Sequence, residues 1–161
     1  MSVRPAILAA ALILLADQIS KFWILEVLHL DLVGRVEVLP PYLVFSMAWN
    51  EGINFGLLSG ESNAWRWVLV AVAFSLAALF ILWSGRPEQH RLARIAAGIL
   101  AGGAAGNGLD RIRFGAVVDF LNMSCCGISN PFSFNIADIA VFAGVAGILI
   151  FGCQRAKDGQ H

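Results

Sequence analysis

Four apolar segments, each long enough to cross a lipid bilayer as a helix, limit the folds open to this chain of 161 residues. A membrane span takes about 20 helical residues. The segments cover roughly residues 5–28, 65–83, 92–109 and 134–153. With 58% hydrophobic and only 14% charged residues, the chain has more apolar surface than one small core could hide. The sequence therefore predicts an all-α membrane protein with four transmembrane helices, folded as a single domain over residues 1–161.

The distribution of basic residues predicts how the spans are oriented. Lys and Arg concentrate between the second and third segments and near both ends of the chain. Cytoplasmic segments of membrane proteins carry an excess of these residues. We therefore expect both termini to be cytoplasmic, and the longer connections, residues 29–64 and 110–133, to be extracytoplasmic. Residues 34–49 are rich in Val, Phe and Trp and are interrupted by two prolines, which predicts a short β-hairpin at the membrane interface.

Two local patterns in the spans have simple interpretations. The first segment follows Arg4, as a secretory signal would, but its apolar pattern continues to Leu28 with no small-residue cleavage pattern after it. In the third segment, glycines recur every fourth residue, which is typical of a helix face that packs closely against a neighbour. These glycines are Gly98, Gly102 and Gly106.

Polar side chains from three of the spans fall at one depth. At a rise of ~1.5 Å per residue, they all lie in the outer half of a hydrocarbon core of ~30 Å. These residues are Asp17, Lys21, Asn107, Asp110 and Asp138. An ionisable residue inside the membrane is by default a candidate for function. Asp119, in the short outer connection before the fourth span, is expected to reach the same level.

Most of these polar groups also have a structural interpretation. Asp17 and Lys21 are spaced i, i+4 and can neutralise each other on one helix face. Asp110 can be an ordinary helix exit, and Asn135 can cap the start of the fourth span. Asp138 has no cation three or four residues away in the sequence, so its partner must come from another part of the chain. Asp119 taken alone could be a solvated loop acid.

Two neighbouring carboxyl groups favour hydrolytic chemistry. When they lie close together they cannot both ionise cheaply, so one keeps a proton. The ionised group can activate a water molecule while the protonated group donates to a substrate carbonyl, which cleaves a peptide without a metal.

Two other functions are compatible with acids in a membrane. A proton- or cation-coupled transport subunit would use them as a relay, but no ionisable residue continues the path through the inner half of the spans. A structural subunit of a larger complex would leave the polar cluster unexplained. The histidines at 29, 90 and 161 lie too far apart to predict a zinc site, and a net charge of zero gives no footprint for nucleic acid. No metal or other cofactor is expected.

Five sequence blocks, in this order, resemble the bacterial lipoprotein signal peptidases, also called signal peptidase II. They are DQISK at 17–21, NEGINFG at 50–56, GGAAGNGLDR at 102–111, VVDF at 117–120 and FNIAD at 134–138. Each block is common by itself, but the set in order on four spans is specific. The resemblance covers nearly the whole chain.

The resemblance implies an aspartic endopeptidase. Such enzymes remove the signal peptide from diacylglyceryl-modified prolipoproteins by cutting before the lipidated cysteine. The resemblance places a catalytic dyad on Asp119 and Asp138. It also implies structural roles for Asp17 and Lys21. We expect Asp110 to be a structural polar group as well. The residues expected to contact substrate or inhibitor are Asn50, Gly52, Asn107, Arg111 and Asn135.

The resemblance also implies a location and a set of partners. The enzyme would be a multi-pass protein of the bacterial cytoplasmic (inner) membrane, with its active site near the extracytoplasmic face. A small extracytoplasmic β-cradle and a short interfacial helix would accompany the spans. Membrane lipids, lipidated prolipoproteins and inhibitors of the globomycin type would be its partners. One block departs from the usual Asn-x-Gly-Ala-Ala-Phe-Gly pattern, because Ile53 and Asn54 replace the two small residues, which changes the expected shape of the cradle.

Overall fold

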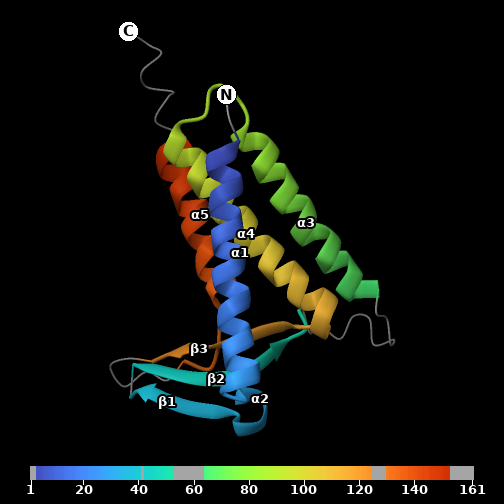
Figure 1. Ribbon diagram of the computed structural model, residues 1–161, viewed down its shortest axis with the longest axis vertical. Coiled ribbons are helices and arrows are strands. Elements are labelled where there is room, and N and C mark those ends of the chain that lie inside the picture. Colours follow the sequence, from blue (N-terminus) through green and yellow to red (C-terminus); the bar gives the residue numbers. More distant parts are fainter. Residues whose placement is uncertain (1–2, 41, 53–63, 125–129, 153–161) are drawn as a thin grey trace.

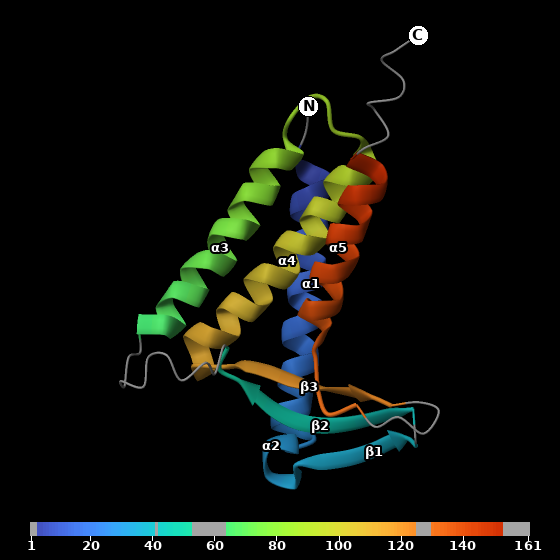
Figure 2. The ribbon, with the colours of Figure 1, turned by 180° about the vertical axis from the view of Figure 1, so that it is seen from behind.

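The computed structural model describes residues 3–40, 42–52, 64–124 and 130–152. Among these residues, four long helices stand side by side, and a three-stranded sheet lies across one end of them (Figures 1 and 2). In chain order the elements are α1 (Arg4–Phe22), the π-helical η1 (Trp23–Val27), α2 (Leu30–Val33), β1 (Arg35–Leu39), β2 (Leu43–Asn50), α3 (Ala64–Ser84), α4 (Arg91–Phe114), β3 (Val117–Met123) and α5 (Ile136–Gly152). Helix α1 begins and α5 ends at the end of the bundle away from the sheet (Figure 1).

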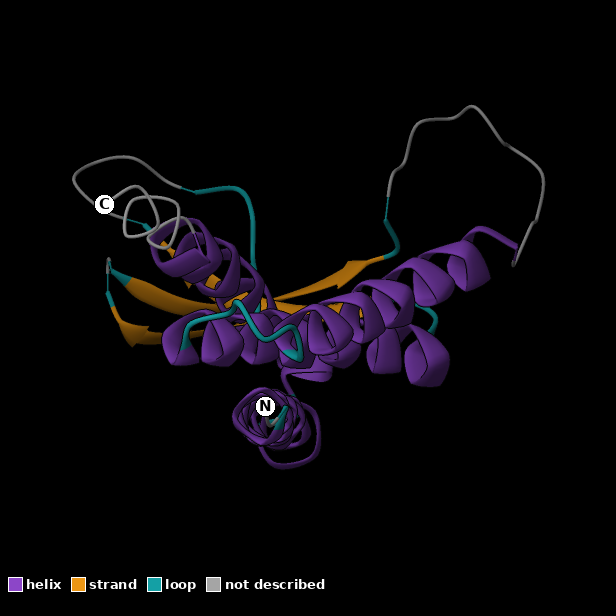
Figure 3. Cartoon of the chain, turned by 90° about the horizontal axis from the view of Figure 1, so that it is seen from above, coloured by secondary structure: helices purple, strands orange, loops and turns teal. Residues whose placement is uncertain are grey.

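Helix α4 is the centre of the bundle and packs against α1, α3 and α5. Seen from above, the N-terminal helix lies to one side of the other helices (Figure 3). Its glycines allow this close packing. A Cβ atom on Gly98, Gly102 or Gly106 would collide with α1, and one on Gly103 would collide with α5. On the side of α3, a Cβ on Gly108 would lie 3.0 Å from a ring carbon of Phe74. The predicted close-packing glycine face is confirmed, and its partner is α1.

The helices differ in how well they fit a membrane span. Within the described residues, Arg4–Val27 and Ala64–Ser84 are long and apolar enough to cross a bilayer, and Ile136–Gly152 is a shorter apolar helix of 17 residues. Helix α4 has 24 residues, but it carries charged side chains and is largely buried. Because three helices surround it, α4 exposes little surface that must be apolar. The count of four spans remains a prediction.

The sheet has the order β1-β2-β3 and is antiparallel throughout. The β-hairpin predicted for residues 34–49 is confirmed as β1 and β2. The connection expected over residues 110–133 is structured in its first half. Helix α4 continues past the predicted end at Leu109, and residues 117–123 form strand β3 along β2. Strand β3 forms here because Val118 and Phe120 are buried against η1 and α2 while its backbone pairs with β2.

A small core fixes the sheet to the end of the bundle. Ile24 of η1, Leu30 of α2 and Val118 and Phe120 of β3 are buried together, with Phe45 of β2 against them. The rings of Phe45 and Phe120 meet edge to face, with centroids 5.9 Å apart. This packing holds β3, and with it Asp119, directly beneath the helices.

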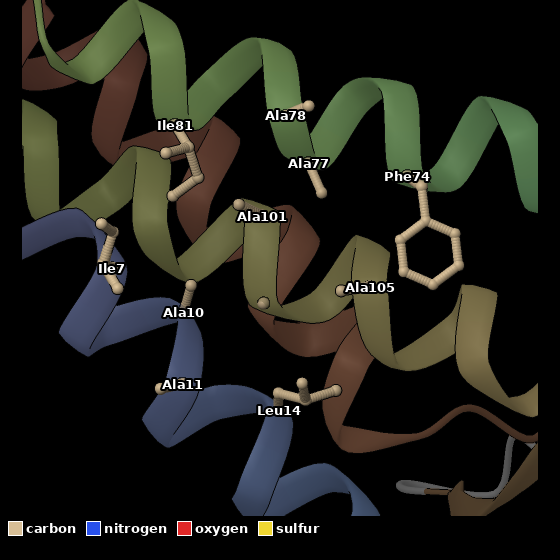
Figure 4. Close-up of a pocket in the computed structure, with 11 residues that line it drawn as sticks. Ile7, Ala10, Ala11, Leu14, Phe74, Ala77, Ala78, Ile81, Ala101 and Ala105 are labelled. Carbon is tan, nitrogen blue, oxygen red and sulfur yellow. The ribbon is translucent and has the colours of Figure 1, made fainter. Parts of the chain in front are cut away.

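Helices α1 and α3 diverge, and an apolar groove of ≈ 450 Å³ lies between them with α4 as its floor (Figure 4). Its lining consists of Ala, Gly, Ile, Leu and Phe side chains from the three helices. A groove without polar groups offers no acid, base or nucleophile.

Candidate active site

Asp119 lies in the middle of β3, opposite Ala48 of β2. Its side chain is only 3% exposed. One carboxylate oxygen, Oδ2, accepts a hydrogen bond from Asn50 Nδ2 at 3.1 Å, and the other, Oδ1, accepts one from Asn135 Nδ2 at 2.6 Å. Asp119 is thus not the solvated loop acid that its sequence position also allowed. It is a buried carboxylate held by two neutral amides.

Asp138 lies in the first turn of α5 and is tied to the residue that caps this helix. Asn135 Oδ1 accepts the backbone N–H of Asp138 at 2.9 Å, and Asp138 Oδ2 accepts the backbone N–H of Asn135 at 3.2 Å. These reciprocal bonds form a capping box, so the predicted capping role of Asn135 is confirmed. The other oxygen of Asp138 accepts a hydrogen bond from Asn107 Nδ2 of α4 at 2.8 Å.

Asn135 connects the two carboxylates. Its amide Nδ2 donates to Asp119 Oδ1, and also to Asn107 Oδ1 at 3.2 Å. The backbone brings these groups together, because the N–H groups of Phe120 and Leu121 both donate to the carbonyl of Phe134. Strand β3 is thereby fastened to the segment that leads into α5. Asp119 and Asp138 belong to one network with three neutral amides, those of Asn50, Asn107 and Asn135.

The surroundings of Asp119 change its acidity. Burial raises the pKa of its carboxyl group from 3.8 to about 6, and the charge of Asp138 adds to this effect. The hydrogen bonds from Asn50 and Asn135 act in the opposite direction but do not cancel it. A carboxyl group with a pKa near neutrality can both hold and release a proton under physiological conditions, which is what acid–base chemistry needs.

Arg111 lies at the end of α4 beside this network. Its Nη1 donates to the carbonyl of Asn107 at 3.1 Å, while its buried Nε has no partner among the described residues. Arg66 of α3, which the sequence did not mark as a contact, donates to the carbonyls of Arg111 and Ile112, both at 2.6 Å. Arg66 thus caps α4 and fixes the backbone from which Arg111 extends.

Gly52 acts on Asn50. Its backbone N–H donates to Asn50 Oδ1 at 3.0 Å, which leaves Asn50 Nδ2 directed at Asp119. Gly52 has φ of 100°, a conformation that favours glycine, and a Cβ here would lie 2.7 Å from Leu69 of α3. The substitutions at Ile53 and Asn54 lie outside the described residues.

The remaining predicted polar residues form a separate group, which we call the ion cluster: Asp17, Gln18, Lys21 and Asp110. Lys21 Nζ lies 2.8 Å from Asp17 Oδ2 and 2.7 Å from Asp110 Oδ2. The predicted pairing of Asp17 with Lys21 is confirmed, whereas the interpretation of Asp110 as a helix exit was wrong. Asp110 is fully buried inside α4 because Lys21 and Gln18 of α1 pair with it. The role of Gln18 was not predicted, although a polar residue between Asp17 and Lys21 in an apolar helix was a visible signal.

The fold and the site together define a class of protein: a bundle of apolar helices whose polar side chains gather around two carboxyl groups at one end. Comparison with known proteins identifies the class further. The family described as Signal peptidase (SPase) II matches residues 9–154. Lipoprotein signal peptidases of Rhodopseudomonas palustris and Nitrobacter hamburgensis are both 39% identical to this chain. The alignments cover 96% of this chain and 97% of the first relative, and 91% and 90% for the second.

Solved structures agree with these relatives. A bacterial membrane enzyme determined by the in meso method at 1.9 Å resolution superposes with a TM-score of 0.70 and 26% sequence identity, covering 92% of each chain. The chain belongs to the signal peptidase II family. It is a membrane protease, and its reaction is the removal of signal peptides from prolipoproteins. The peptidase interpretation of the sequence is therefore confirmed over the alternative of a transport subunit.

Proposed function

We propose that Asp119 and Asp138 are the catalytic dyad of this peptidase, and that they cleave the peptide bond before the lipidated cysteine of a diacylglyceryl-modified prolipoprotein. The observation that carries the proposal is the shared partner Asn135, which binds both carboxylates at once. Neutral amides orient these carboxylates without consuming their charge, so the pair keeps its capacity for proton transfer.

The reaction needs one proton and one water between the two carboxyl groups. The ionised carboxylate takes a proton from the water, and the resulting hydroxide forms a bond to the scissile carbonyl carbon while the protonated carboxyl group donates to the carbonyl oxygen. The tetrahedral diol then collapses. Its carbon–nitrogen bond breaks, the proton taken from water passes to the leaving amine, and a diol hydroxyl returns its proton to the dyad.

The neighbouring polar residues supply contacts for the substrate. Arg111 carries a buried Nε donor that has no partner within the described part of the chain, which suits a backbone carbonyl of the signal peptide. Asn50, Asn107 and Asn135 donate hydrogen bonds to the dyad, and their side chains can rearrange towards the peptide as it binds. Gly52, which has no Cβ, allows the chain after Asn50 to pack close to Leu69 of α3.

A groove on the outer face of α5 suits the apolar part of the substrate. It has a volume of ≈ 600 Å³ and is lined by Phe134, Asp138, Ile139, Phe142, Ala143 and Ala146. Asp138 is the polar residue in this lining, and it lies at the end of α5 nearest the sheet. A signal-peptide helix lying along this groove would reach the dyad from the lipid phase, so membrane lipids and lipidated precursors would share this route.

The remaining parts of the proposal concern the membrane. We infer that the single domain crosses the bacterial cytoplasmic (inner) membrane four times, with both termini cytoplasmic and the sheet acting as an extracytoplasmic cradle. Helix α1 begins and α5 ends at the end of the bundle opposite the sheet, which supports this orientation (Figure 2). A short interfacial helix would complete the cradle. Inhibitors of the globomycin type would bind at the dyad.

Replacement of each aspartate tests the dyad. Asp119→Asn and Asp138→Asn keep the shape of the side chain but remove its acid–base chemistry, so each is expected to lower kcat by about 10³-fold or more. Cleavage is measured with purified protein in detergent on a diacylglyceryl-modified precursor and on its unlipidated twin. The exposed Asp31→Asn of α2 is the matched control and should retain full activity. Near-normal turnover by either dyad variant would refute the assignment, and equal cleavage of both precursors would refute the substrate class.

A bulky side chain in the α5 groove tests the path of the signal peptide. Ala143→Trp fills the groove at a distance from the dyad, so KM for the lipidated precursor should rise several-fold while kcat changes little. Ala78→Trp, in the separate groove between α1 and α3, is the control. If the two variants have the same KM, the signal peptide does not lie along α5.

A further inference from the structure

We propose that the ion cluster is a positioning device for the dyad, which sets the distance between the two catalytic carboxyl groups through the backbone N–H groups that precede them. This inference rests on the proposed function of Asp119 and Asp138. Two independent hydrogen bonds, one to each catalytic segment, carry it.

The first bond reaches the segment of Asp119. Asp110 Oδ2 accepts the backbone N–H of Val118 at 3.1 Å. Val118 directly precedes Asp119 and is completely buried. This bond fixes the backbone next to Asp119. The position of Asp110 therefore sets the direction in which the side chain of Asp119 projects from β3.

The second bond reaches the segment of Asp138. Asp17 Oδ1 accepts the backbone N–H of Ala137 at 3.0 Å. Ala137 precedes Asp138 in the first turn of α5, where N–H groups have no partner within the helix. Asp17 of α1 supplies this partner and thereby anchors the start of α5.

Lys21 and Gln18 join the two anchors into one unit. Lys21 Nζ contacts both carboxylates, and Gln18 Nε2 donates to Asp17 Oδ2 at 3.1 Å and to Asp110 Oδ1 at 3.0 Å. All four carboxylate oxygens are therefore occupied, and neither Asp17 nor Asp110 can move without the other. An ion pair that served only to bind α1 to α4 would not need the backbone of both catalytic segments.

Gly106 provides a way to disturb the cluster without touching its charges. A Cβ atom at Gly106 would lie 2.7 Å from Asp17 Oδ2, so Gly106→Ala must displace that carboxylate. A misplacement of about 1 Å can cost on the order of 100-fold in rate. We expect Gly106→Ala to lower kcat by about that factor while KM for the lipidated precursor stays within about twofold.

Gly98→Ala is the matched control. Gly98 lies on the same face of α4, where a Cβ would collide with Ala6 of α1, well away from the ion cluster. This variant should lose thermal stability but keep the wild-type kcat and pH profile, measured well below its melting temperature. If it does not accumulate, Gly147→Ala, whose Cβ would lie 2.7 Å from Ala96 Cβ, takes its place.

The pH profile of kcat/KM separates positioning from general stability. The charged groups that interact with Asp119 are Lys21 of α1, Arg111 of α4 and Asp138 of α5. Asp110 of α4 binds the backbone N–H of the residue that precedes Asp119. A change in the spacing of the dyad alters its coupled titration, so Gly106→Ala and Asp110→Asn should both shift the profile. The inference is overturned if both variants keep the wild-type kcat and profile, or if Gly98→Ala loses as much kcat as Gly106→Ala. Turnover by Asp119→Asn would instead refute the proposed function.

Discussion

Two groups of carboxylates lie at the same end of this bundle, and they differ in the charge of their side-chain partners. In the ion cluster, Asp17 and Asp110 share a lysine, and every oxygen has a partner. Around Asp119 and Asp138, the side-chain donors are neutral amides. The charged partners of the ion cluster suit a structural role, whereas the neutral partners of the second group suit a chemical one. A carboxylate neutralised by an ammonium group is a poor proton acceptor, whereas one held by amides remains available for a water molecule and a substrate.

The largest effect that this comparison predicts is on stability, at Lys21. Lys21→Met leaves two buried carboxylates without their cation, which should cost about 3–5 kcal/mol and lower the melting temperature in detergent. Arg35→Met is the control, because its pair with Glu37 is exposed and spans 3.9 Å. Equal melting temperatures for the two variants would show that the ion cluster does not stabilise the bundle.

A smaller effect, and one that depends on pH, is expected at Asp119. Its pKa is raised from 3.8 to about 6, so the contribution of this group to stability is present below 3.8 and is lost as the pH rises through 6. Asp119→Asn removes this dependence. Between about pH 4 and pH 8, the wild type should lose on the order of 3 kcal/mol relative to the variant. Melting curves across this range test the sign, and parallel curves would contradict the burial argument.

The smallest effect on stability is expected at Asn135, which both caps α5 and links the two carboxylates. Asn135→Ala removes a helix cap, at a cost of about 1 kcal/mol, and it also removes the link between the two carboxylates. Its activity should therefore fall far more than its stability. His90 caps the N-terminus of α4, where its Nδ1 accepts the backbone N–H of Leu92 at 3.3 Å. His90→Ala should lose stability alone, and a parallel loss of activity would mean that Asn135 acts only as a cap.

Much of the fold could be predicted from local patterns. The apolar segments, the glycine face of α4 and the hairpin of β1 and β2 follow from composition and periodicity over short windows. Strand β3 could not be predicted in this way, because its apolar side chains are covered by η1 and α2, which come from a distant part of the chain. Its mixed run of valines and one acid became a strand only when β2 offered an edge for pairing.

The sequence by itself determined the residues of the candidate site and the end of the helices at which they gather. The motifs carry Asp119, Asp138 and their amide partners, and the rise of a helix places most of the polar groups at one level. The tertiary structure decided how these groups are paired. Asp110 could be an exit residue or a buried anchor, and the choice depended on Lys21 and Gln18 of another helix. Spacing along a chain limits which side chains share a face, but the partner that neutralises a buried charge comes from whichever element packs against it.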